Sequence, residues 1–433
     1  MKLALILLCT ALICLLSTFS LQAQETSLNI ADPDAIPEPM PLLDYGGYDI
    51  ENILLLGSDT TNPVNAGRTD VMVIVSINRS AGTVSMLSIP RDLYVYIPDH
   101  EVARINIAYG YGQHDGTGGF ERLAETIRYN LGLQIDHYAR VDFADFKNIV
   151  DALGSIEIAV DCAIQDWRLI EPDLDPTVEE NWAMYTLPVG VHEMDGDLAL
   201  WYARSRRTSS DFDRGRRHQQ LLRALWARIR ELNLLDQLSD IYPQALETVE
   251  TDLQLSDMLD LMPLALGLDP SRIASYTFRP NIETRSWLSP EGSDVLVPQR
   301  EAIRALELQM IEPPTEHQLV RENPRVEIVN ASGSSSMARV AADRLVWEGF
   351  TPVISETLPA YQDRTMIYDY TGQSKSGSLA ALQTALRVRD ENIVIEPDPN
   401  RMVDFRVVIG GVYSSCTYNV ALPRELATEE PAG

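Results

Sequence analysis

Basic residues are scarce in this chain of 433 residues. It has 35 Lys and Arg against 63 Asp and Glu, which gives a formal net charge of -28. A general nucleic-acid binder needs a basic surface that displaces counterions from phosphates, so this balance argues against that class of function. Any site for a phosphate group must therefore be local. A chain of this length is expected to form two domains with flanking segments, and its 45% hydrophobic fraction is enough for packed cores.

Histidine and cysteine are also rare. The six His are scattered and show no zinc-ligand spacing. Of the four Cys, Cys9 and Cys14 lie in the N-terminal apolar run, which leaves Cys162 and Cys416 in the body of the protein. These two lie far apart in the sequence and in different predicted domains, so we expect neither a metal centre nor a structural disulfide between them.

Long apolar runs are absent except at the start of the chain. One Lys is followed by an almost unbroken apolar run from Leu3 to Leu16 and then by small and polar residues around Ala23. This order predicts a secretory signal peptide over residues 1–23, because the run hardly reaches the roughly 20 apolar residues that span a bilayer. A short uncleaved anchor is the alternative. In both cases the body of the protein is expected outside the cytoplasmic membrane, after a Pro-rich acidic spacer over residues 24–49.

The first strands are predicted from residue 50 onward. NILLLGSD is typical of a buried strand, and TDVMVIVSIN and TVSMLSIP predict an antiparallel hairpin around the turn RSAG. Pairing Asn78 with Thr83 sets Asp70 opposite Arg91 at one end of the sheet, where Pro90 ends the second strand. The mixed strand and helix patterns of residues 50–310 predict a three-layer α-β-α domain with a mixed central sheet. Residues 161–185 are expected to be a surface insertion.

A second domain is predicted after a linker over residues 311–324, IEPPTEHQLVRENP. Residues 325–414 alternate strand and helix patterns, with two helices expected on one sheet, which indicates a small α+β domain. Residues 415–433 form an acidic tail without a core-forming pattern.

One stretch concentrates arginines in this acidic chain. Residues 202–220, YARSRRTSSDFDRGRRHQQ, contain six of them. Most charge runs are solvated helix faces. Here, however, Arg214, Arg217 and His218 continue the apolar stripe of the same predicted helix and should point inward.

The position of these arginines on the helix favours an anion site. Asp211 or Asp213 is expected to cap the helix, which places cations in its first turn, where the helix dipole disfavours them unless an anion is bound. Arg204 and Arg206 precede the helix across a short loop and can converge on the same point. We therefore predict a local site for a phosphate-containing anion.

Two aspartates are candidate ligands of a divalent cation. Asp59 follows the first strand in GSD, and Asp70 begins the second strand in GRTD. Magnesium prefers a few carboxylates and leaves coordination positions for phosphate oxygens. The structural alternative is that Asp59 only makes a turn and Asp70 only caps a strand.

The motifs GSD, GRTD, SIPRD, RIN, YARSRR and DFDRGRRHQQ, in this order, resemble the LytR-CpsA-Psr family of envelope phosphotransferases over roughly residues 50–235. Residues 325–413, which open with RVEIVNASG and close with FRVVIGGVY, resemble the LytR C-terminal domain. The resemblance implies transfer of a glycopolymer from a polyprenyl-pyrophosphate carrier at the membrane surface onto a cell-wall acceptor such as peptidoglycan, with Mg²⁺ and without nucleic acid.

Matching positions imply roles for individual residues. Asp59 and Asp70 would bind the metal and take part in catalysis. The remaining implied residues are Arg91, Arg204 and Arg206 as catalytic groups, and Arg68, Arg214, Arg217 and His218 as substrate-binding groups. His218 stands where the family usually has Gln, so its charge is expected to depend on pH. The apolar face of the helix at residues 221–229 is a candidate wall for the lipid tail, with an ordinary core role as the alternative.

Two other functions fit the same sequence. One is a hydrolase that releases the lipid-linked sugar to water, since only the entering nucleophile differs from transfer. The other is a non-catalytic envelope module that binds lipid carriers. Asp70 and Asp92 are the candidates for deprotonating an acceptor hydroxyl.

Overall fold

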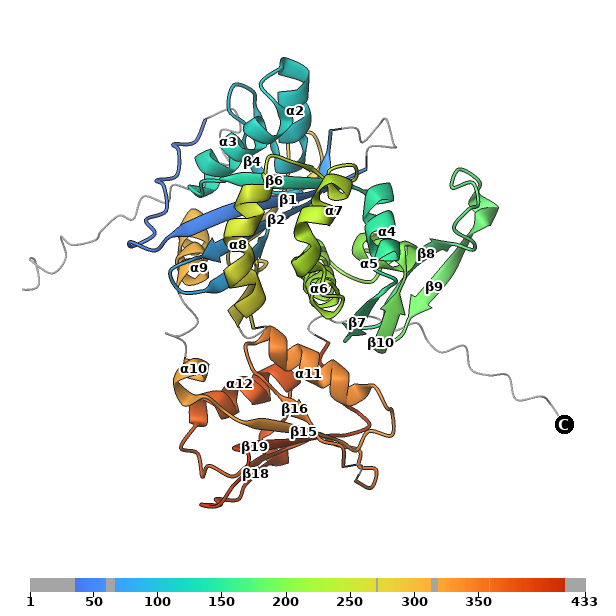
Figure 1. The fold of residues 1–433 in the computed structure, drawn as a ribbon, viewed down its shortest axis with the longest axis vertical. Coiled ribbons are helices and arrows are strands. Elements are labelled where there is room, and N and C mark those ends of the chain that lie inside the picture. Colours follow the sequence, from blue (N-terminus) through green and yellow to red (C-terminus); the bar gives the residue numbers. More distant parts are fainter. Residues whose placement is uncertain (1–35, 60–66, 270–271, 313–317, 358, 417–433) are drawn as a thin grey trace, which may run out of the picture.

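The computed structural model describes residues 36–59, 67–269, 272–312, 318–357 and 359–416 (Figure 1). The predicted signal peptide, most of the acidic tail and part of the predicted spacer and linker lie outside the described residues. Within the described part of the chain, no helix combines the length and the hydrophobicity needed to cross a membrane.

The larger domain is built on a mixed sheet with the strand order β11-β6-β1-β2-β3-β12. β1 pairs antiparallel to β2 and parallel to β6, and β3 pairs antiparallel to β2 and parallel to β12. These strands are β1 (Ile50–Ser58), β2 (Thr69–Asn78), β3 (Thr83–Ser88), β6 (His137–Asp142), β11 (Glu250–Thr251) and β12 (Ile273–Thr277).

Successive side chains of the central strands point to opposite faces of the sheet and contribute to two hydrophobic cores, one on each face. Leu54, Leu56 and Met72 pack on one face with apolar residues of α3 and α9, whereas Ile53 and Val73 pack on the other. The period of two residues per strand produces this division. The first face carries α2 (Ala108–Asp115), α3 (Gly119–Leu131) and α9 (Arg300–Ile311), and the second face carries α4 (Phe143–Ala152), α5 (Gly196–Arg204), α6 (Asp211–Glu231), α7 (Leu238–Ala245) and α8 (Leu255–Gly267). The three-layer prediction is confirmed.

The predicted hairpin register is confirmed. Asn78 faces Thr83 and Val73 faces Ser88, so the sum of paired residue numbers stays constant along the ladder. β3 ends at Ser88, two residues before Pro90. The register brings Asp70 and Arg91 to the same end of the sheet.

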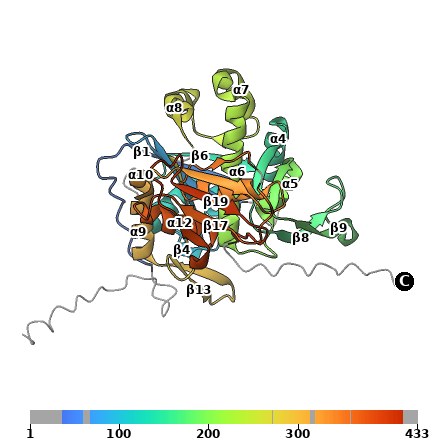
Figure 2. The same cartoon turned by 90° about the horizontal axis from the view of Figure 1, so that it is seen from below.

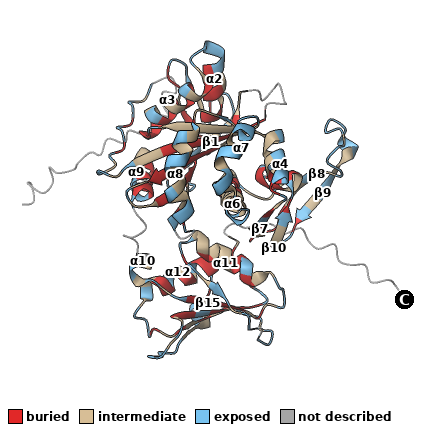
Figure 3. Ribbon diagram, viewed as in Figure 1, coloured by how far each residue is buried: buried red, intermediate tan, exposed pale blue. Residues whose placement is uncertain are grey.

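Smaller elements surround this sheet. The predicted surface insertion forms the hairpin of β8 and β9, which projects from the body beside α5 (Figures 1 and 2). Figure 3 shows that this hairpin is largely exposed or half-buried. The paired short strands are β4 (Tyr94–Tyr96) with β5 (Val102–Arg104), β7 (Ile156–Val160) with β10 (Gly190–Met194), β8 (Ile164–Leu169) with β9 (Trp182–Leu187), and β13 (Thr284–Leu288) with β14 (Asp294–Pro298). The single-turn 3-10 helices are η1 (Ile105–Ile107), η2 (Glu179–Asn181), η3 (Leu234–Gln237) and η6 (Asp390–Asn392).

The second domain has a sheet with the order β16-β15-β19-β17-β18 and helices α11 and α12 on one face, as the sequence predicts. Its helices lie between that sheet and the larger domain (Figure 1). Its elements are α10 (Gln318–Glu322), β15 (Val326–Asn330), α11 (Met337–Trp347), β16 (Val353–Ile354), β17 (Met366–Asp369), α12 (Ser376–Leu386), β18 (Ile393–Ile395) and β19 (Phe405–Ile409).

A disulfide joins the two domains. Cys162 and Cys416 are bonded across a sequence separation of 254 residues, with Cα atoms 5.1 Å apart. The prediction of no disulfide was therefore wrong. The reason is that the chain after β19 returns to the larger domain, and only the docked arrangement of the two domains brings these cysteines together.

Candidate active site

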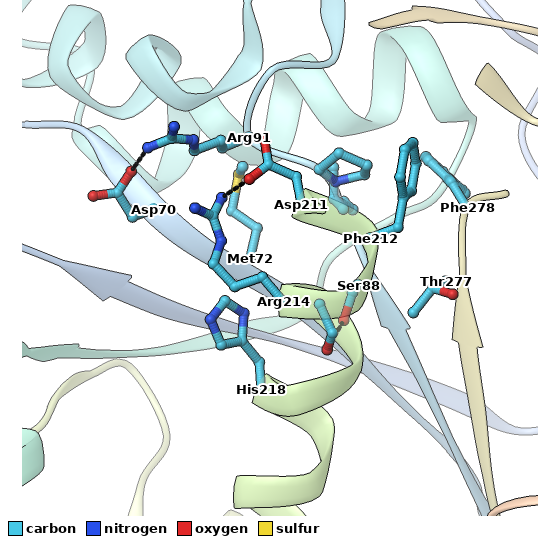
Figure 4. A pocket seen from close by; sticks show the side chains of 13 residues that line it. Asp70, Met72, Ser88, Arg91, Asp211, Phe212, Arg214, His218, Thr277 and Phe278 are labelled. Atoms are coloured by element: carbon cyan, nitrogen blue, oxygen red, sulfur yellow. Dashed lines mark hydrogen bonds and ion pairs between the residues drawn. The ribbon is translucent and has the colours of Figure 1, made fainter. Parts of the chain in front are cut away.

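A polar pocket lies where the ends of β2 and β3 meet the first turns of α6 (Figure 4). It is a cavity of about 20 Å³, which is room for about one water molecule. Polar side chains from the sheet and from α6 line it together with two phenylalanines. The residues that bear on its chemistry are Asp70, Ser88, Arg91, Asp211, Phe212, Arg214, His218 and Phe278.

The N-terminus of α6 is fixed by a capping box. The Ser210 side chain accepts a hydrogen bond from the backbone N–H of Asp213, and the Asp213 carboxylate accepts one from the backbone N–H of Ser210 at 2.9 Å. The predicted cap at Asp211 or Asp213 was therefore wrong, because the N-cap residue is Ser210, which directly precedes Asp211. Asp211 is left to pair with Arg214, whose Nη2 lies 3.0 Å from Asp211 Oδ1.

Arg91 lies across the sheet end from Asp70, as the hairpin register implies. Its Nη1 donates to Asp70 Oδ1 at 2.9 Å, and its Nε lies 3.4 Å from Asp92 Oδ2. Figure 4 shows the guanidinium groups of Arg91 and Arg214 close to each other, between the carboxylates of Asp70 and Asp211. Two cations and two anions thus lie within one small volume.

Arg214 is a buried cation. It is 6% exposed, and burial lowers the pKa of its guanidinium to about 10. The carboxylate of Asp211 opposes that shift, whereas the positive charges of Arg91 and Arg206 add to it. The charged form is therefore held at a cost that a bound anion would reduce.

Asp59 and Asp70 approach each other through the pairing of β1 with β2. Ser58 pairs with Thr69 at the end of the ladder, and each aspartate follows one of these two residues. Asp59 is 9% exposed, and Arg204 Nη2 lies 3.7 Å from its Oδ2. The described residues contain no group of three or more His, Cys, Asp or Glu arranged to hold a metal ion. Two carboxylates nevertheless fit an ion that fills its other positions with water or phosphate oxygens.

The remaining predicted arginines differ in position. Arg204 ends α5, is exposed and lies over the Phe143 ring with its Cζ 4.7 Å from the centroid. Arg206 is exposed in the loop before α6 and lies near enough to Arg214 and Asp211 to shift their pKa values. Of the predicted site residues, the pocket lining within the described residues includes Asp70, Arg91, Arg214 and His218 but not Asp59, Arg68, Arg204, Arg206 or Arg217.

Arg217 is buried and serves the loop before α6. It is 3% exposed, its Nη1 donates to Ser209 Oγ at 2.8 Å, and its Nη2 donates to the Ser205 carbonyl. Its guanidinium also lies over the Tyr202 ring, 5.5 Å from the centroid. These contacts hold the segment that carries Arg206, so Arg217 acts on the pocket through that loop.

His218 has a different role from the one that its substitution for Gln suggests. It is 8% exposed, and its Nε2 lies 3.0 Å from the Ala203 carbonyl oxygen, so Nε2 carries a proton and donates it there. Burial, together with the nearby charge of Arg214, lowers the pKa of His218 to about 3. The imidazole is therefore neutral at ordinary pH, and the expectation of a pH-dependent charge was wrong.

An apolar cavity of about 200 Å³ lies on the other side of His218. Its lining is almost entirely apolar and comes from β1, β2 and β6 on the sheet and from α4, α5 and α6. Leu221, Leu222 and Leu225 of the predicted helix wall line it, and His218 lines both this cavity and the polar pocket. The basic pocket and the apolar cavity therefore adjoin through one side chain.

One acidic residue of the site, Asp211, was not among the predicted site residues, and Asp92 was predicted only as a candidate base for the acceptor hydroxyl. Asp211 lines the pocket, and Asp92 lies between Arg91 and Arg104, whose Nη1 is 3.3 Å from Asp92 Oδ1. Burial raises the pKa of Asp92, and its hydrogen bond with Asp211 adds to the effect. The motifs SIPRD and DFDRG display both residues, but only the packing of α6 on the sheet shows that they are neighbours.

Comparisons with known proteins agree with these motifs. The profile of the LytR_cpsA_psr family matches residues 17–312, and the profile described as LytR cell envelope-related transcriptional attenuator matches residues 323–413. The polyisoprenyl-teichoic acid–peptidoglycan teichoic acid transferase TagT of Bacillus subtilis (strain 168) is 30% identical over 243 residues, which cover 54% of this chain and 70% of TagT. TagU of Oceanobacillus iheyensis, with the same descriptive name, is 31% identical over 234 residues, which cover 54% of this chain and 67% of TagU.

Solved structures of the same group are also similar. The crystal structure of B. subtilis TagV is 26% identical, covers 61% of this chain and 97% of that chain, and has a TM-score of 0.49. A structure of TagT with bound octaprenyl pyrophosphate lipid is 24% identical, covers 66% of this chain and 97% of that chain, and has a TM-score of 0.43. Because the first profile alone matches more than half of its residues, this chain belongs to the LytR-CpsA-Psr family.

Proposed function

We propose that this protein is an extracytoplasmic phosphotransferase that moves a glycopolymer from a polyprenyl-pyrophosphate carrier onto a cell-wall acceptor such as peptidoglycan. The observation that carries the proposal is the junction at His218, where a pocket with buried Arg214 adjoins an apolar cavity. A lipid pyrophosphate has the same two parts in the same order, a dianionic head and an apolar tail. The curated relatives TagT and TagU are named as transferases of this kind.

The head group is held by arginines that are paired with carboxylates in the unliganded protein. The pocket of about 20 Å³ is too small for a diphosphate, so the diphosphate lies at its mouth. Arg91 and Arg214 then exchange their contacts with Asp70 and Asp211 for phosphate oxygens, and the exposed Arg204 and Arg206 close on the other side. Charge-assisted, bidentate contacts of this kind are what guanidinium groups supply to phosphates.

Two apolar cavities are available to the lipid tail. An apolar cavity of about 150 Å³ in another protein binds benzene, so the cavity of about 200 Å³ beside His218 has room for a segment of an isoprenoid chain. A second apolar cavity of about 360 Å³ shares Leu55 and Leu222 with the first, and further walls come from α8. The two cavities form a path along the sheet face beneath α6.

The transfer step moves one phosphoryl linkage. The acceptor hydroxyl oxygen attacks the phosphorus that carries the sugar, a new P–O bond forms, and polyprenyl phosphate leaves with the bridging oxygen. The proton of the acceptor hydroxyl passes to a carboxylate, and Asp92 suits this role because its pKa is raised. The arginines stabilise the negative charge of the transition state by position and charge, which is the main requirement of phosphoryl transfer.

Asp59 and Asp70 would hold Mg²⁺ at the same sheet end. The donor set supports this assignment, because two carboxylates on paired strands are hard oxygen ligands that leave room for phosphate oxygens. When bound, the ion supplies positive charge that neutralises the diphosphate. The protein acts at the cell envelope, either secreted after removal of its signal peptide or retained by an N-terminal anchor.

The proposal is tested with the purified chain, a lipid-pyrophosphate saccharide and a glycan acceptor. We expect glycan-linked product only when the acceptor is present, and we expect Asp70→Asn and Arg206→Gln to lose turnover. Arg207→Gln is the matched control, since Arg207 is exposed in the same loop but, unlike Arg206, is not among the charges that shift the pKa values of Arg214 and Asp211. If the sole product is free phosphorylated sugar whether or not acceptor is added, the protein is a hydrolase and the transferase proposal fails.

A further inference from the structure

An aromatic groove lies next to the anion site, on the side of the β8–β9 hairpin. It is a cavity of about 420 Å³ between this hairpin and α5, and three of the six tryptophans of the chain line it. These are Trp167 on β8, Trp182 on β9 and Trp201 on α5. The function proposed above uses none of them.

Two of the tryptophans are held in place by hydrogen bonds of their indole N–H groups. Trp201 Nε1 donates to the Trp167 carbonyl at 2.9 Å, and Trp182 Nε1 donates to the Pro176 carbonyl at 3.0 Å. Tyr185 meets Trp201 edge to face, with ring centroids 5.0 Å apart. Trp167 is 51% exposed, so about half of this aromatic residue is presented to solvent. Because the N–H groups of Trp182 and Trp201 are already satisfied, these two side chains offer aromatic surface rather than a free donor to the groove.

The groove borders two of the arginines proposed to hold the diphosphate. Arg204, Ser205 and Arg206 line it as well as the tryptophans. The Asp166 carboxylate on β8 accepts hydrogen bonds from the backbone N–H groups of Arg206 at 2.8 Å and Arg207 at 3.2 Å, so the hairpin is fastened to the loop that carries Arg206. A ligand in the groove would therefore lie beside the diphosphate.

The lining matches one class of ligand. Flat π faces suit the apolar C–H face of a pyranose ring, which is weakly positive, whereas the ring edge needs charged or polar partners for its hydroxyl groups. The groove offers such partners in the ion pair of Lys147 with Asp197 and in Arg168. A lipid tail would remove water from these charged groups without forming hydrogen bonds to them, and a nucleic acid would meet a strongly acidic protein.

We propose that the groove between the β8–β9 hairpin and α5 binds a pyranose glycan next to the transferred phosphate, with Trp167 as its principal stacking surface. This inference rests on the proposed function and adds a saccharide subsite to it. The glycan can belong to either of two sources, the saccharide of the lipid-linked donor or the glycan strand of the acceptor.

The experiment compares three variants of the full chain. Trp167→Ala removes an exposed aromatic ring but leaves the backbone hydrogen bonds of the β8–β9 hairpin in place. Trp167→Phe keeps an aromatic ring at this position. Trp287→Ala is the matched control, because Trp287 is a half-buried tryptophan that packs against Tyr94 outside the groove. The probes are an N-acetylglucosamine tetrasaccharide, undecaprenyl pyrophosphate without sugar, and the same lipid pyrophosphate carrying a disaccharide.

We expect Trp167→Ala to weaken glycan binding about tenfold, which is the scale of one stacking contact, and Trp167→Phe to weaken it less than about threefold. Loss of tetrasaccharide binding with a raised acceptor KM assigns the groove to the acceptor. Loss confined to the disaccharide-bearing lipid, with a raised donor KM, assigns it to the donor. Binding of sugar-free undecaprenyl pyrophosphate should match wild type in all three variants.

The inference is overturned if Trp167→Ala binds both the tetrasaccharide and the disaccharide-bearing lipid as well as wild type, or if Trp287→Ala weakens them equally. Failure of the proposed function has a different signature. In that case the wild-type chain does not bind sugar-free undecaprenyl pyrophosphate, whatever its affinity for saccharides.

Discussion

Replacing Arg214 by Gln should separate function from stability. Burial lowers the pKa of Arg214 from its ordinary value to about 10, and each pKa unit corresponds to about 1.4 kcal/mol, so keeping this side chain charged in the fold costs about 3 kcal/mol. Because the pKa of Arg214 is lower in the folded state than in the unfolded state, its charge destabilises the fold at pH values below about 10. The penalty decreases as the pH rises above that value. Loss of the charge removes this cost.

The ion pair with Asp211 acts in the opposite direction. A hydrogen bond to a charged group contributes about 1.5–3 kcal/mol, and the Gln amide can retain one such bond to the Asp211 carboxylate. The pKa of about 10 already includes the attraction of Asp211, so the two contributions are not added, and we expect Arg214→Gln to leave the free energy of unfolding unchanged or to raise it by at most about 3 kcal/mol. In this variant a bound diphosphate lacks a buried, charged partner, which typically costs about 2–5 kcal/mol, so the affinity for diphosphate should fall about thirtyfold or more.

Two assays on the same preparations test this expectation. Denaturant unfolding gives the free energy of unfolding, and titration with undecaprenyl pyrophosphate gives the affinity. Arg214→Lys is the informative companion, because it keeps a charge but lacks the planar fork and should bind with intermediate affinity. Wild-type affinity in Arg214→Gln, combined with a loss of several kcal/mol in stability, would show that Arg214 is a structural ion-pair residue and would refute the reasoning.

Three further outcomes follow from other parts of the molecule. Leu222→Trp fills the junction of the two apolar cavities, so affinity for undecaprenyl pyrophosphate should drop at least about tenfold while inorganic pyrophosphate binds as before, both measured by calorimetry. Cys162→Ser removes the disulfide with Cys416 and should lower the stability measured by thermal unfolding. The chain-entropy model of a disulfide that closes a loop of 254 residues limits the loss to about 5 kcal/mol. Unchanged unfolding would mean that the packing of the two domains is sufficient without the disulfide. Burial raises the pKa of Glu307 to about 8, so stability should fall as pH rises from 4.5 to 8, with a slope of at most about 1.4 kcal/mol per pH unit, and Glu307→Gln should flatten the unfolding profile over that range.

The parts of the fold that follow from local patterns could be predicted from sequence. The alternation in TDVMVIVSIN and the turn RSAG fix the hairpin register, and that register alone places Asp70 near Arg91. The inward direction of Arg214 and Arg217 follows from helical periodicity, and both are buried. In these cases one element, or two consecutive elements, contains all the information.

The parts that depend on docking could not be predicted. The disulfide of Cys162 with Cys416 requires the second domain to pack against the first, and nothing in either local sequence encodes that arrangement. The neutral state of His218 depends on its burial beside the charge of Arg214, which lowers its pKa and which the Gln-to-His change in the motif does not reveal. The tryptophans of the groove are separated by up to 34 residues and meet only because the β8–β9 hairpin folds beside α5.

Helix α6 connects the polar pocket with the second domain, because its arginines contact both. Arg214 points into the polar pocket, whereas Arg216 pairs with Asp161 at 2.7 Å and lies over the Trp347 ring of α11, 5.2 Å from its centroid. Arg223 lies over the same ring at 5.4 Å. The second domain therefore contacts the helix that carries Arg214, on a face that does not line the pocket. Because Asp161 directly precedes Cys162, the disulfide fastens the second domain beside this ion pair, and the position of α6 relative to the sheet is supported from both sides.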